Sequence, residues 1–367
     1  MSSALTTPTA PAAEVPAFAQ KMTDALNGAA LMLMASVGHR TGLFDAMASM
    51  PPATSAELAD EACLSERYVR EWLGAMVMAG VVLHDPAAGT YRLPPAHAAW
   101  LTRAAGPRNL AVAAQWVSVL GGVEDLVVDA FGHGRGVPYS AYRRFHQVMA
   151  EDSAARVVSV LLSDILPLEP SLPARLEAGI DVLDVGCGTG GALIAMAAAY
   201  RRSRFSGCDI AADALASARA DACRRGLRNV RFLHHDAADA IEPGVYDLVL
   251  AIDAIHDQVK PDRVLSNVAA ALRPGGTFLM VDVRASSRHH ENLALPLGTF
   301  LYTISCMHCV SVSLAGGGPG LGAAWGEELA LRMLNEAGFS PVRVEHLEGD
   351  LLNNYYIAAA PARGELP

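Results

Sequence analysis

The sequence predicts an α/β protein in which a parallel sheet with helices on both faces follows a separate, helical N-terminal domain. From Ile180 onward, short apolar segments alternate with amphipathic ones, which is the pattern of strands joined by helical crossovers. A glycine-rich stretch, 186–191, follows the first of these segments. Residues 25–102 instead show helical periodicity and end in a short hairpin. The length of 367 residues agrees with two domains.

The N-terminal region predicts a winged helix. Thr54 and Glu57 have the residue types and the spacing of a capping box at the start of a helix. After a second helical stretch, segments 81–83 and 91–93 have strand character and are joined by a turn that contains proline and glycine. Two helices, a turn and a β-ribbon make up a winged helix.

The charge of this region argues against DNA binding. Residues 1–102 carry five basic and nine acidic residues, a net charge of −4, and the whole chain has a net charge of −10. A protein that reads a duplex needs a positive face to neutralise phosphates. A packing or dimerisation domain is therefore favoured, and no nucleic-acid partner is expected.

Composition divides the chain into four parts. Residues 1–20 lack the basic start and the apolar core of a signal peptide, which predicts a disordered tail and a cytoplasmic protein. Residues 21–102 form the winged-helix or dimerisation domain. Residues 103–173 form a helical connector that ends in a cluster of three prolines. Residues 174–367 form the second domain.

Seven segments of the second domain have the length and apolar character of strands. The last two are joined by the turn 347–354, which is too short for a parallel crossover, so the last strand should be antiparallel. The expected strands are 180–185, 204–208, 229–234, 246–252, 277–283, 341–346 and 355–359. The expected helices between them are 190–200, 212–226, 261–272 and 326–337.

No charged residue lies between Glu291 and Glu327, which raises the question of a membrane span. Hydroxyl side chains, a proline, a glycine and a histidine interrupt its most apolar part, 293–315, so no span is predicted. The glycine-rich tract 316–320 indicates a mobile lid or hinge.

The six cysteines are too sparse for a disulfide framework, and reduced thiols are expected. Cys306 and Cys309 form a CxxC pair around His308, but no second pair completes a four-ligand zinc site. We therefore expect no metal.

The glycine-rich stretch is the most informative motif. Residues 184–191 read D-V-G-C-G-T-G-G and satisfy the G-x-G-x-x-G pattern of dinucleotide-binding turns. Three features favour another ligand: the acid at Asp184, the alternating glycines and the antiparallel end of the sheet. With the preceding strand, the motif resembles motif I of class I S-adenosylmethionine-dependent methyltransferases. The resemblance implies a Rossmann-like, seven-stranded sheet of order 3-2-1-4-5-7-6 with an antiparallel last strand.

The resemblance also implies how S-adenosylmethionine is bound. Asp209 would hydrogen-bond the ribose hydroxyls, Ile210 would pack on the adenine and Asp236 would bind its amino group. Asp184 and the glycine backbone would face the methionine end. The implied cofactor-binding residues are Asp184, Gly186, Cys187, Gly188, Gly190, Asp209, Ile210, Asp236, Ala237 and Asp253.

The candidate base is His256, directly after the fourth expected strand and at the same sheet edge as the glycines. His256 and Asp257 resemble the H-D-W motif of winged-helix small-molecule O-methyltransferases, in which this histidine is the base. Asp282 matches the acid that orients it there. Gln258 replaces the tryptophan, and Asp282 is shorter than the usual glutamate. A general base, a pocket wall and a structural histidine all remain open for His256.

Four further residues are candidates for contact with the acceptor. Phe145 and Met149 lie in a stretch similar to one that closes the pocket of these enzymes, although a core helix stripe fits equally well. Tyr302 and His308 lie in the uncharged run, where this fold inserts its acceptor-binding segment, and packing is an equal alternative for His308. The absence of charge favours a neutral or aromatic acceptor.

The resemblance implies methyl transfer from S-adenosylmethionine to a small, largely apolar or aromatic acceptor, at a hydroxyl oxygen with His256 as base. It also implies a homodimer formed by the N-terminal helices, with 32–34 at the interface. The alternative is a winged-helix transcriptional regulator that binds S-adenosylmethionine or another small ligand.

Overall fold

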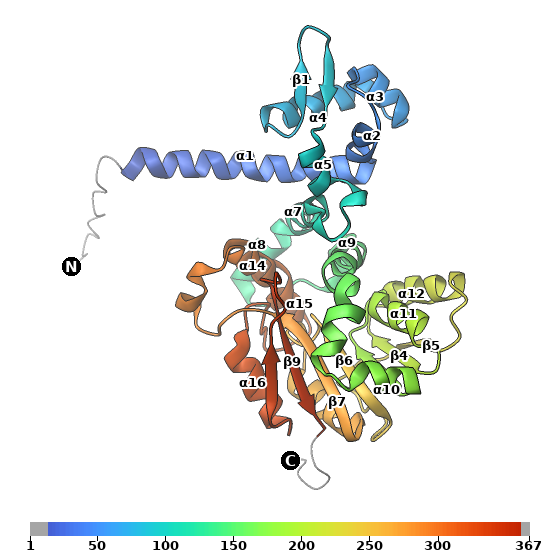
Figure 1. The fold of residues 1–367 in the computed structure, drawn as a ribbon. Coiled ribbons are helices and arrows are strands. Elements are labelled where there is room, and N and C mark those ends of the chain that lie inside the picture. The colour runs from blue at the N-terminus through green and yellow to red at the C-terminus, as the bar shows by residue number, and fades with distance from the viewer. Residues whose placement is uncertain (1–13, 361–367) are drawn as a thin grey trace, which may run out of the picture. The chain divides into compact units, whose positions relative to one another are not determined.

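The computed structural model describes residues 14–360, and the chain divides between Ser118 and Val119 into two compact units. The N-terminal unit is helical apart from one hairpin (Figure 1). Its elements are α1 (Glu14–Thr41), α2 (Leu43–Ser49), α3 (Ser55–Glu61), α4 (Glu66–Met78), β1 (Leu83–Asp85), β2 (Thr90–Arg92), α5 (Pro95–Leu101), α6 (Leu110–Ala113) and α7 (Gln115–Gly121), which spans the division. The predicted ribbon is confirmed, because β1 pairs antiparallel with β2. Thr54 and Glu57 form the predicted capping box.

The start of α1 corrects the prediction of a disordered tail over 1–20. Residues 1–13 lie outside the described residues, but 14–20 form the first turns of α1. The prediction used the absence of an export signal, which carries no information about helix formation. The stretch contains alanine and glutamine, which are good helix formers.

The core of the N-terminal unit depends on a close approach between α1 and α4. Trp72 is 3% exposed, and its indole nitrogen donates a 2.8 Å hydrogen bond to the Met34 carbonyl. Its ring meets Phe44 edge to face, with centroids 5.3 Å apart. Gly38 permits this packing, because a Cβ there would lie 2.6 Å from the Trp72 ring and 2.8 Å from Phe44.

We therefore expect Gly38→Ala to destabilise the N-terminal unit by about 1–3 kcal/mol, the usual cost of overpacking a core. The matched control is Gly28→Ala in the same helix, where nothing lies within 4 Å of the added Cβ. Alanine there should stabilise the helix by about 1 kcal/mol. Thermal unfolding followed by circular dichroism measures both. Equal effects of the two substitutions would contradict the packing argument.

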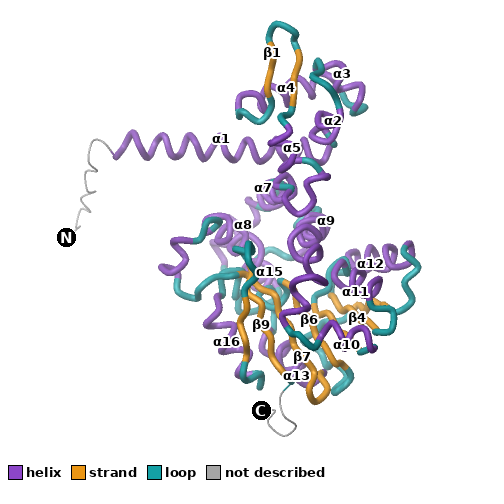
Figure 2. The backbone as a smooth tube through the Cα atoms, in the orientation of Figure 1, coloured by secondary structure: helices purple, strands orange, loops and turns teal. Residues whose placement is uncertain are grey.

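The C-terminal unit is built on a seven-stranded sheet of order β5-β4-β3-β6-β7-β9-β8 (Figure 2). Counted from its first strand, this is 3-2-1-4-5-7-6, and β9 runs antiparallel to both neighbours, so the predicted topology is confirmed. The strands are β3 (Asp181–Val185), β4 (Arg204–Asp209), β5 (Val230–His234), β6 (Tyr246–Ile252), β7 (Leu272–Val283), β8 (Val342–Glu345) and β9 (Asn353–Ala359). The predicted strand 277–283 begins earlier, at Leu272.

Helices cover both faces of this sheet. Alternate residues of β3 enter different cores: Val182 packs with α10, α11 and α12, and Leu183 packs with α13 and α16. Residues Val157 and Leu161 of the expected connector belong to the first core, so much of that segment is part of the C-terminal unit. The helices of this unit are α8 (Glu124–His133), α9 (Phe145–Ser153), α10 (Leu172–Ala178), α11 (Gly191–Ala199), α12 (Ala212–Arg224), α13 (Pro261–Ala271), α14 (Gly298–Ile304), α15 (Val310–Ala315) and α16 (Gly326–Glu336).

The uncharged run forms α14, a π-helical turn and α15. By length and composition alone, the stretch Gly298–Ala315 would suffice to cross a membrane. Its hydroxyl groups instead bind neighbouring backbone: Ser311 Oγ accepts from the Val137 amide at 2.8 Å, and Ser313 Oγ donates to the Gln258 carbonyl at 2.9 Å. In the structure, this stretch packs as a helix of the C-terminal unit.

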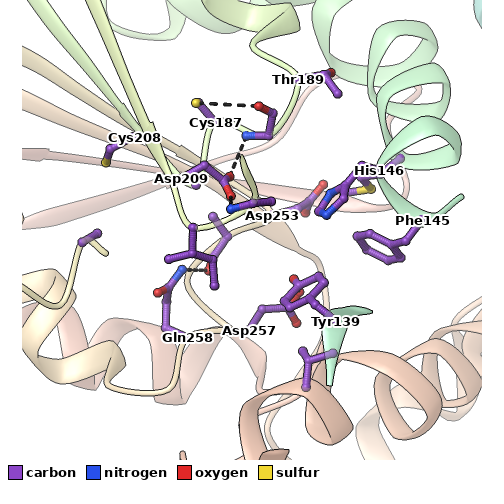
Figure 3. Close-up of a pocket in the computed structure, with 18 of the residues that line it drawn as sticks. Tyr139, Phe145, His146, Cys187, Thr189, Cys208, Asp209, Asp253, Asp257 and Gln258 are labelled. Atoms are coloured by element: carbon purple, nitrogen blue, oxygen red, sulfur yellow. Dashed lines mark hydrogen bonds between the residues drawn. The ribbon is translucent and has the colours of Figure 1, made fainter. Parts of the chain in front are cut away.

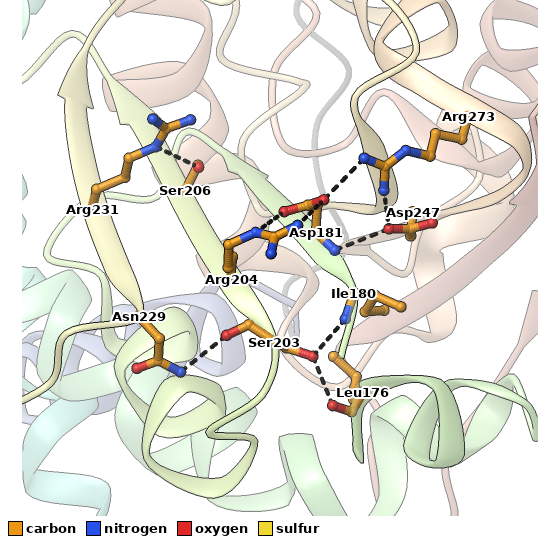
Figure 4. A network of polar contacts seen from close by, with 10 residues as sticks. All are labelled: Leu176, Ile180, Asp181, Ser203, Arg204, Ser206, Asn229, Arg231, Asp247 and Arg273. Atoms are coloured by element: carbon orange, nitrogen blue, oxygen red, sulfur yellow. Dashed lines mark hydrogen bonds and ion pairs between the residues drawn. The ribbon is translucent and has the colours of Figure 1, made fainter. Parts of the chain in front are cut away.

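A polar network ties the strands together at the amino-terminal edge of the sheet (Figure 4). Asp181, at the start of β3, receives two hydrogen bonds of 2.7 and 2.8 Å from Arg204 and one of 3.0 Å from Arg273. Arg273 also pairs with Asp247. These guanidinium groups hold the pKa of Asp181 below its usual value, chiefly through the hydrogen bonds from Arg204. The opposite, carboxyl-terminal edge is left for the site described next.

Candidate active site

The glycine-rich turn joins β3 to α11 at the carboxyl edge of the sheet. Gly186, Gly188 and Gly190 all have positive φ angles, of 71°, 52° and 73°. A Cβ on Gly186 would lie 2.6 Å from Ala254, and one on Gly190 would lie 2.4 Å from the Phe232 ring. Among the described residues other than its two chain neighbours, none has an atom within 4 Å of the corresponding point at Gly188, so the middle of the turn is open to a ligand.

Asp209, the last residue of β4, fixes the shape of this turn. One carboxylate oxygen accepts a 2.8 Å hydrogen bond from the Gly188 amide, and the other accepts one of 2.8 Å from the Ala211 amide. Figure 3 shows Asp209 beside the turn. The carboxylate is thus held where the turn and the end of β4 meet.

A cavity of about 1090 Å³ lies at this edge of the sheet, within the C-terminal unit. All the predicted cofactor-binding residues line it except Gly190, which is buried against Phe232. The end of the cavity beside the glycine turn is lined by Asp184, Gly186, Cys187, Gly188, Asp209, Ile210, Asp236, Ala237 and Asp253. The other end is lined by Tyr139, Phe145, His146, Met149, Asp257 and Gln258.

Two carboxylates at the glycine end each have a buried oxygen without a hydrogen-bond partner among the residues that the structure describes. Burial, reinforced by the charge of Asp209, raises the pKa of Asp184 to about 8. Burial likewise raises the pKa of Asp253 to about 6. Asp253 is also held at a positive φ of 49°. Such carboxylates are expected where a positively charged ligand completes the site.

His256 and Asp282 meet behind the other end of the cavity. His256 is 4% exposed, and its Nδ1 lies 2.8 Å from Asp282 Oδ1. The same oxygen accepts hydrogen bonds from the Trp325 indole at 3.1 Å and from the Val283 amide at 2.7 Å. The predicted pair is therefore brought together, and Asp282 is itself fixed by two donors.

Asp257, rather than His256, is the member of this group that lines the cavity. Its Oδ1 lies 3.5 Å from Nε2 of His256. Its Oδ2 accepts a 2.9 Å hydrogen bond from the Tyr139 hydroxyl and lies 3.7 Å from Nδ1 of His308. Burial alone would lower the pKa of His256, but the Asp282 and Asp257 carboxylates raise it well above its usual value.

The predicted acceptor contacts are only partly brought together. Phe145 and Met149 line the cavity, but Tyr302 and His308 do not. Tyr302 lies beside Asn292, whose amide nitrogen donates to its hydroxyl at 2.8 Å. His308 is buried behind Phe145, with the two rings stacked at 3.9 Å, and burial lowers its pKa to about 4.

Two glycines pack closely in the tract after α15, for which a mobile lid or hinge is predicted. A Cβ on Gly316 would lie 2.4 Å from the Val259 side chain, and one on Gly318 would lie 2.7 Å from its Cα. These glycines permit close packing against the loop that follows β6.

Cys309, the buried member of the CxxC pair, lies beside the histidine and the cavity carboxylate. Donor atoms of His256, Asp257 and Cys309 lie within 4.8 Å of one another, close enough to surround a metal ion. Burial raises the pKa of the Cys309 thiol to about 12, so that the thiol is protonated and hydrogen-bonds within the group.

Sequence reasoning did not identify Tyr139 or His146. Both line the cavity and their rings stack with centroids 5.8 Å apart. Tyr139 is separated from its partner Asp257 by 118 residues, and no local pattern marks it. The aromatic density of 139–146 was the available signal.

Comparison with known proteins identifies two domains in this chain. Residues 29–103 match an Rv2258c-like winged HTH domain, and residues 176–338 match a methyltransferase domain. A fatty-acid O-methyltransferase of Mycolicibacterium smegmatis is 36% identical over 109 residues, which are 29% of this chain and 38% of that protein. The match thus spans well under half of that relative.

Solved structures resemble nearly the whole chain in fold. The mitomycin 7-O-methyltransferase superimposes with a TM-score of 0.68 at 18% identity, covering 95% of this chain and 100% of that chain. Human N-acetylserotonin methyltransferase, solved with S-adenosylmethionine, has a TM-score of 0.66 at 18% identity and covers 97% and 100%. The chain therefore contains a winged helix-turn-helix domain followed by a methyltransferase domain, and over nearly its whole length it has the fold of these S-adenosylmethionine-dependent methyltransferases.

Proposed function

We propose that the protein is a cytoplasmic enzyme that methylates a hydroxyl oxygen of a small, largely apolar or aromatic molecule. One observation carries the proposal: a single cavity has a glycine turn with buried carboxylates at one end and the Asp257 carboxylate, backed by His256 and Asp282, at the other. S-adenosylmethionine would supply an electrophilic methyl group on a sulfonium. The six free cysteines accord with a reducing compartment.

The residues at the glycine end fit this cofactor. The unpartnered oxygens of Asp184 and Asp253 suit the positive charges of its sulfonium and ammonium groups. The open backbone at Gly188 allows a close approach, and Asp209 offers carboxylate oxygens to ribose hydroxyls. Ile210, which is 57% exposed, offers an apolar surface for the adenine, and Asp236 offers an acceptor for its amino group.

The other end of the cavity fits removal of a proton. A hydroxyl acceptor loses its proton as the new O–CH₃ bond forms, so a basic group must lie beside it. The His256, Asp257 and Asp282 assembly supplies such a group, with His256 at its centre. Phe145, Met149 and Tyr139 provide the apolar and aromatic walls.

The direct test is incubation of the purified protein with S-adenosylmethionine and a panel of small phenols and aliphatic hydroxy compounds. Mass spectrometry should show S-adenosylhomocysteine together with a product heavier by one CH₂. Failure to bind S-adenosylmethionine in calorimetry would contradict the proposal outright.

Cofactor binding should release a proton near neutral pH. Asp184, with a pKa of about 8 in the free protein, is mostly protonated at pH 7, and a cationic ligand favours its ionised form. Affinity should therefore fall as the pH falls below 8, by roughly 20-fold between pH 8.5 and 6.5 for one such group. Calorimetry in two buffers of different ionisation enthalpy measures the released proton. Asp184→Asn is the control, and an equal release in this variant would assign the proton to another group.

The homodimer stays a proposal for the N-terminal unit. On α1, Phe18, Met22 and Leu26 recur every four residues and are 64%, 54% and 72% exposed, so the helix presents an apolar stripe. Of the residues predicted at the interface, Met32 and Leu33 are 37% and 41% exposed. Light scattering should give twice the chain mass, and Leu26→Glu should lower it; a single-chain mass for the unmodified protein contradicts the dimer.

The regulator hypothesis gains no support from the winged helix. Arg67 and Arg70 of α4 each pair with an acidic residue of the same helix, Glu71 and Glu66, so this helix does not present the positive face that a duplex reader needs. Both hypotheses use the cavity, but the enzyme hypothesis also gives a role to the His256, Asp257 and Asp282 assembly.

A further inference from the structure

Three side chains of the types that ligate metals meet behind the acceptor end of the cavity. Ligand atoms of His256, Asp257 and Cys309 all lie within 4.8 Å of one another. The first two residues stand in the loop after β6, and Cys309 ends the π-helical turn between α14 and α15. The prediction of no metal rested on the lack of a second CxxC pair in the sequence. The fold instead gives Cys309 partners from another segment.

The distance between the first two ligand atoms suits a zinc ion. Nε2 of His256 and Oδ1 of Asp257 are 3.5 Å apart. In a tetrahedral site with zinc–nitrogen and zinc–oxygen bonds of about 2.0–2.2 Å, two neighbouring ligand atoms are separated by about 3.4 Å. The Cys309 sulfur lies within 4.8 Å of both atoms and has to approach them by about 1 Å at most. A set of one imidazole, one carboxylate and one thiol is typical of zinc.

Both ligands of the loop after β6 are oriented by outer partners. Nδ1 of His256 lies 2.8 Å from Asp282, so Nε2 is the nitrogen that faces Asp257. Oδ2 of Asp257 accepts a 2.9 Å hydrogen bond from Tyr139, so Oδ1 is the oxygen that faces His256 (Figure 3). Metal-binding histidines usually have a carboxylate on their second nitrogen, and ligating carboxylates are hydrogen-bonded in their turn. The observed contacts reproduce both arrangements.

The Oδ1 atom of Asp257 gives a second, independent indication of a ligand. This oxygen is buried and has no hydrogen-bond partner among the residues that the structure describes. A buried carboxylate oxygen is costly unless a hydrogen bond or a metal ion satisfies it. The groups that interact electrostatically with His256 are acidic, chiefly Asp282 and Asp257, which favours a dication. Because the Asp257 side chain is 11% exposed and lines the cavity, an ion reaches the group from the cavity.

From these contacts we propose that His256, Asp257 and Cys309 bind a zinc ion, and that the bound ion inhibits methyl transfer. Bonds form from zinc to Nε2, Oδ1 and Sγ, and water from the cavity completes the four ligands. The thiol proton of Cys309 and any proton on Nε2 pass to the solvent. Nε2 is also the atom with which His256 takes the acceptor proton, so a zinc ion there removes the base. The binding site is independent of the proposed function, and the inhibition rests on it.

Cobalt(II) is the spectroscopic probe of this site and needs no acceptor. Added to reduced, metal-free, full-length protein, it should give the visible bands of tetrahedral cobalt and a near-ultraviolet sulfur-to-cobalt charge-transfer band, and zinc should abolish both. Cys309→Ser should lose the charge-transfer band. The matched control is Cys306→Ser, which removes the exposed thiol of the same pair and should keep the band.

Calorimetry with zinc measures the strength of the site. Loss of an outer partner of a metal ligand costs about 10- to 100-fold in affinity, so loss of the ligand itself in Cys309→Ser should raise the Kd by at least that factor. Asp257→Asn tests the same site at a second ligand and should also raise the Kd, and thermal unfolding shows whether each variant is folded. A charge-transfer band that is absent from the unmodified protein, or that persists in Cys309→Ser, overturns the site. A zinc affinity unchanged in Asp257→Asn overturns it as well.

Kinetics with an acceptor found by the phenol panel tests the inhibition. Zinc at about ten times its Kd should lower the rate about tenfold, because about one site in eleven stays free, and a chelator should restore the rate. Higher acceptor concentrations should relieve the inhibition, since acceptor and ion meet at the same end of the cavity. Each variant is compared with its own metal-free rate, so Cys306→Ser should be inhibited like the unmodified protein and Cys309→Ser should not.

The outcomes separate the two proposals. Zinc that binds without slowing transfer overturns the inhibitory role, whereas the site and the proposed function stand. Absence of transfer by the metal-free protein to every acceptor counts against the proposed function, and the cobalt spectra still decide whether the site exists.

Discussion

Replacing His256 by alanine should abolish most methyl transfer while leaving cofactor binding intact. The side chain lies behind the acceptor end of the cavity, between Asp257 and Asp282. Without it, the carboxylates of Asp257 and Asp282 lose the imidazole that lies between them. We expect a fall in kcat of about 10²- to 10⁴-fold, the range for loss of proton-transfer machinery.

His346→Ala is the control for this experiment, because His346 is exposed at the end of β8. Affinity for S-adenosylmethionine, measured by calorimetry, should be the same in both variants and in the unmodified protein. An unchanged kcat in His256→Ala would show that His256 takes no part in proton transfer and only lines the pocket or packs. A lost cofactor affinity would show instead that the substitution disturbs the loop after β6.

The second large effect is expected at Asp209. Its carboxylate holds the turn through the Gly188 and Ala211 amides and also lines the cavity. Asp209→Ala removes two charge-assisted hydrogen bonds as well as the group that we assign to the ribose. The hydrogen bond to the ribose is itself worth about 1.5–3 kcal/mol, so cofactor affinity should fall by roughly 10- to 150-fold or more.

Asp221→Ala tests whether this loss is specific. Asp221 lies on α12 and pairs with Arg224 and Arg225 away from the cavity. Its replacement should leave the affinity within twofold of the unmodified value. Asp209→Asn keeps one acceptor oxygen, so its affinity for S-adenosylmethionine should lie between that of Asp209→Ala and that of the unmodified protein. A normal affinity in Asp209→Ala would mean that the glycine turn needs no support from β4.

The sheet could be predicted because its information is local. Each strand of the C-terminal unit is a short apolar run, and both faces are buried, as Val182 and Leu183 illustrate. The short turn before β9 set the antiparallel end. Strand limits moved by a few residues, most at β7, which begins at Leu272, the last residue of an expected helix.

The acceptor end could be predicted less well because its contacts join distant segments. Tyr139 reaches Asp257 across 118 residues, and Phe145 covers His308, for which contact with the acceptor and packing were equal alternatives. The local sequence pattern around a histidine in an apolar run is the same whether its side chain faces a cavity or packs on an aromatic ring. The close approach of Gly318 to Val259 likewise leaves no trace in the local sequence, where glycines suggested a hinge.

The two ends of the cavity have different origins in the chain. The glycine end consists of loops that directly continue β3, β4, β5 and β6, whereas much of the acceptor end is walled by Tyr139–Met149 and the end of α15, which lie outside the sheet. The residues that wall the acceptor end can therefore change in evolution while the residues of the glycine end stay the same. Segments 136–149 and 305–320 contact each other through Gly136, Val137 and Tyr142, which pack on or hydrogen-bond Ser311 and Met307. Replacing both segments together with those of a relative should therefore transfer that relative's acceptor preference.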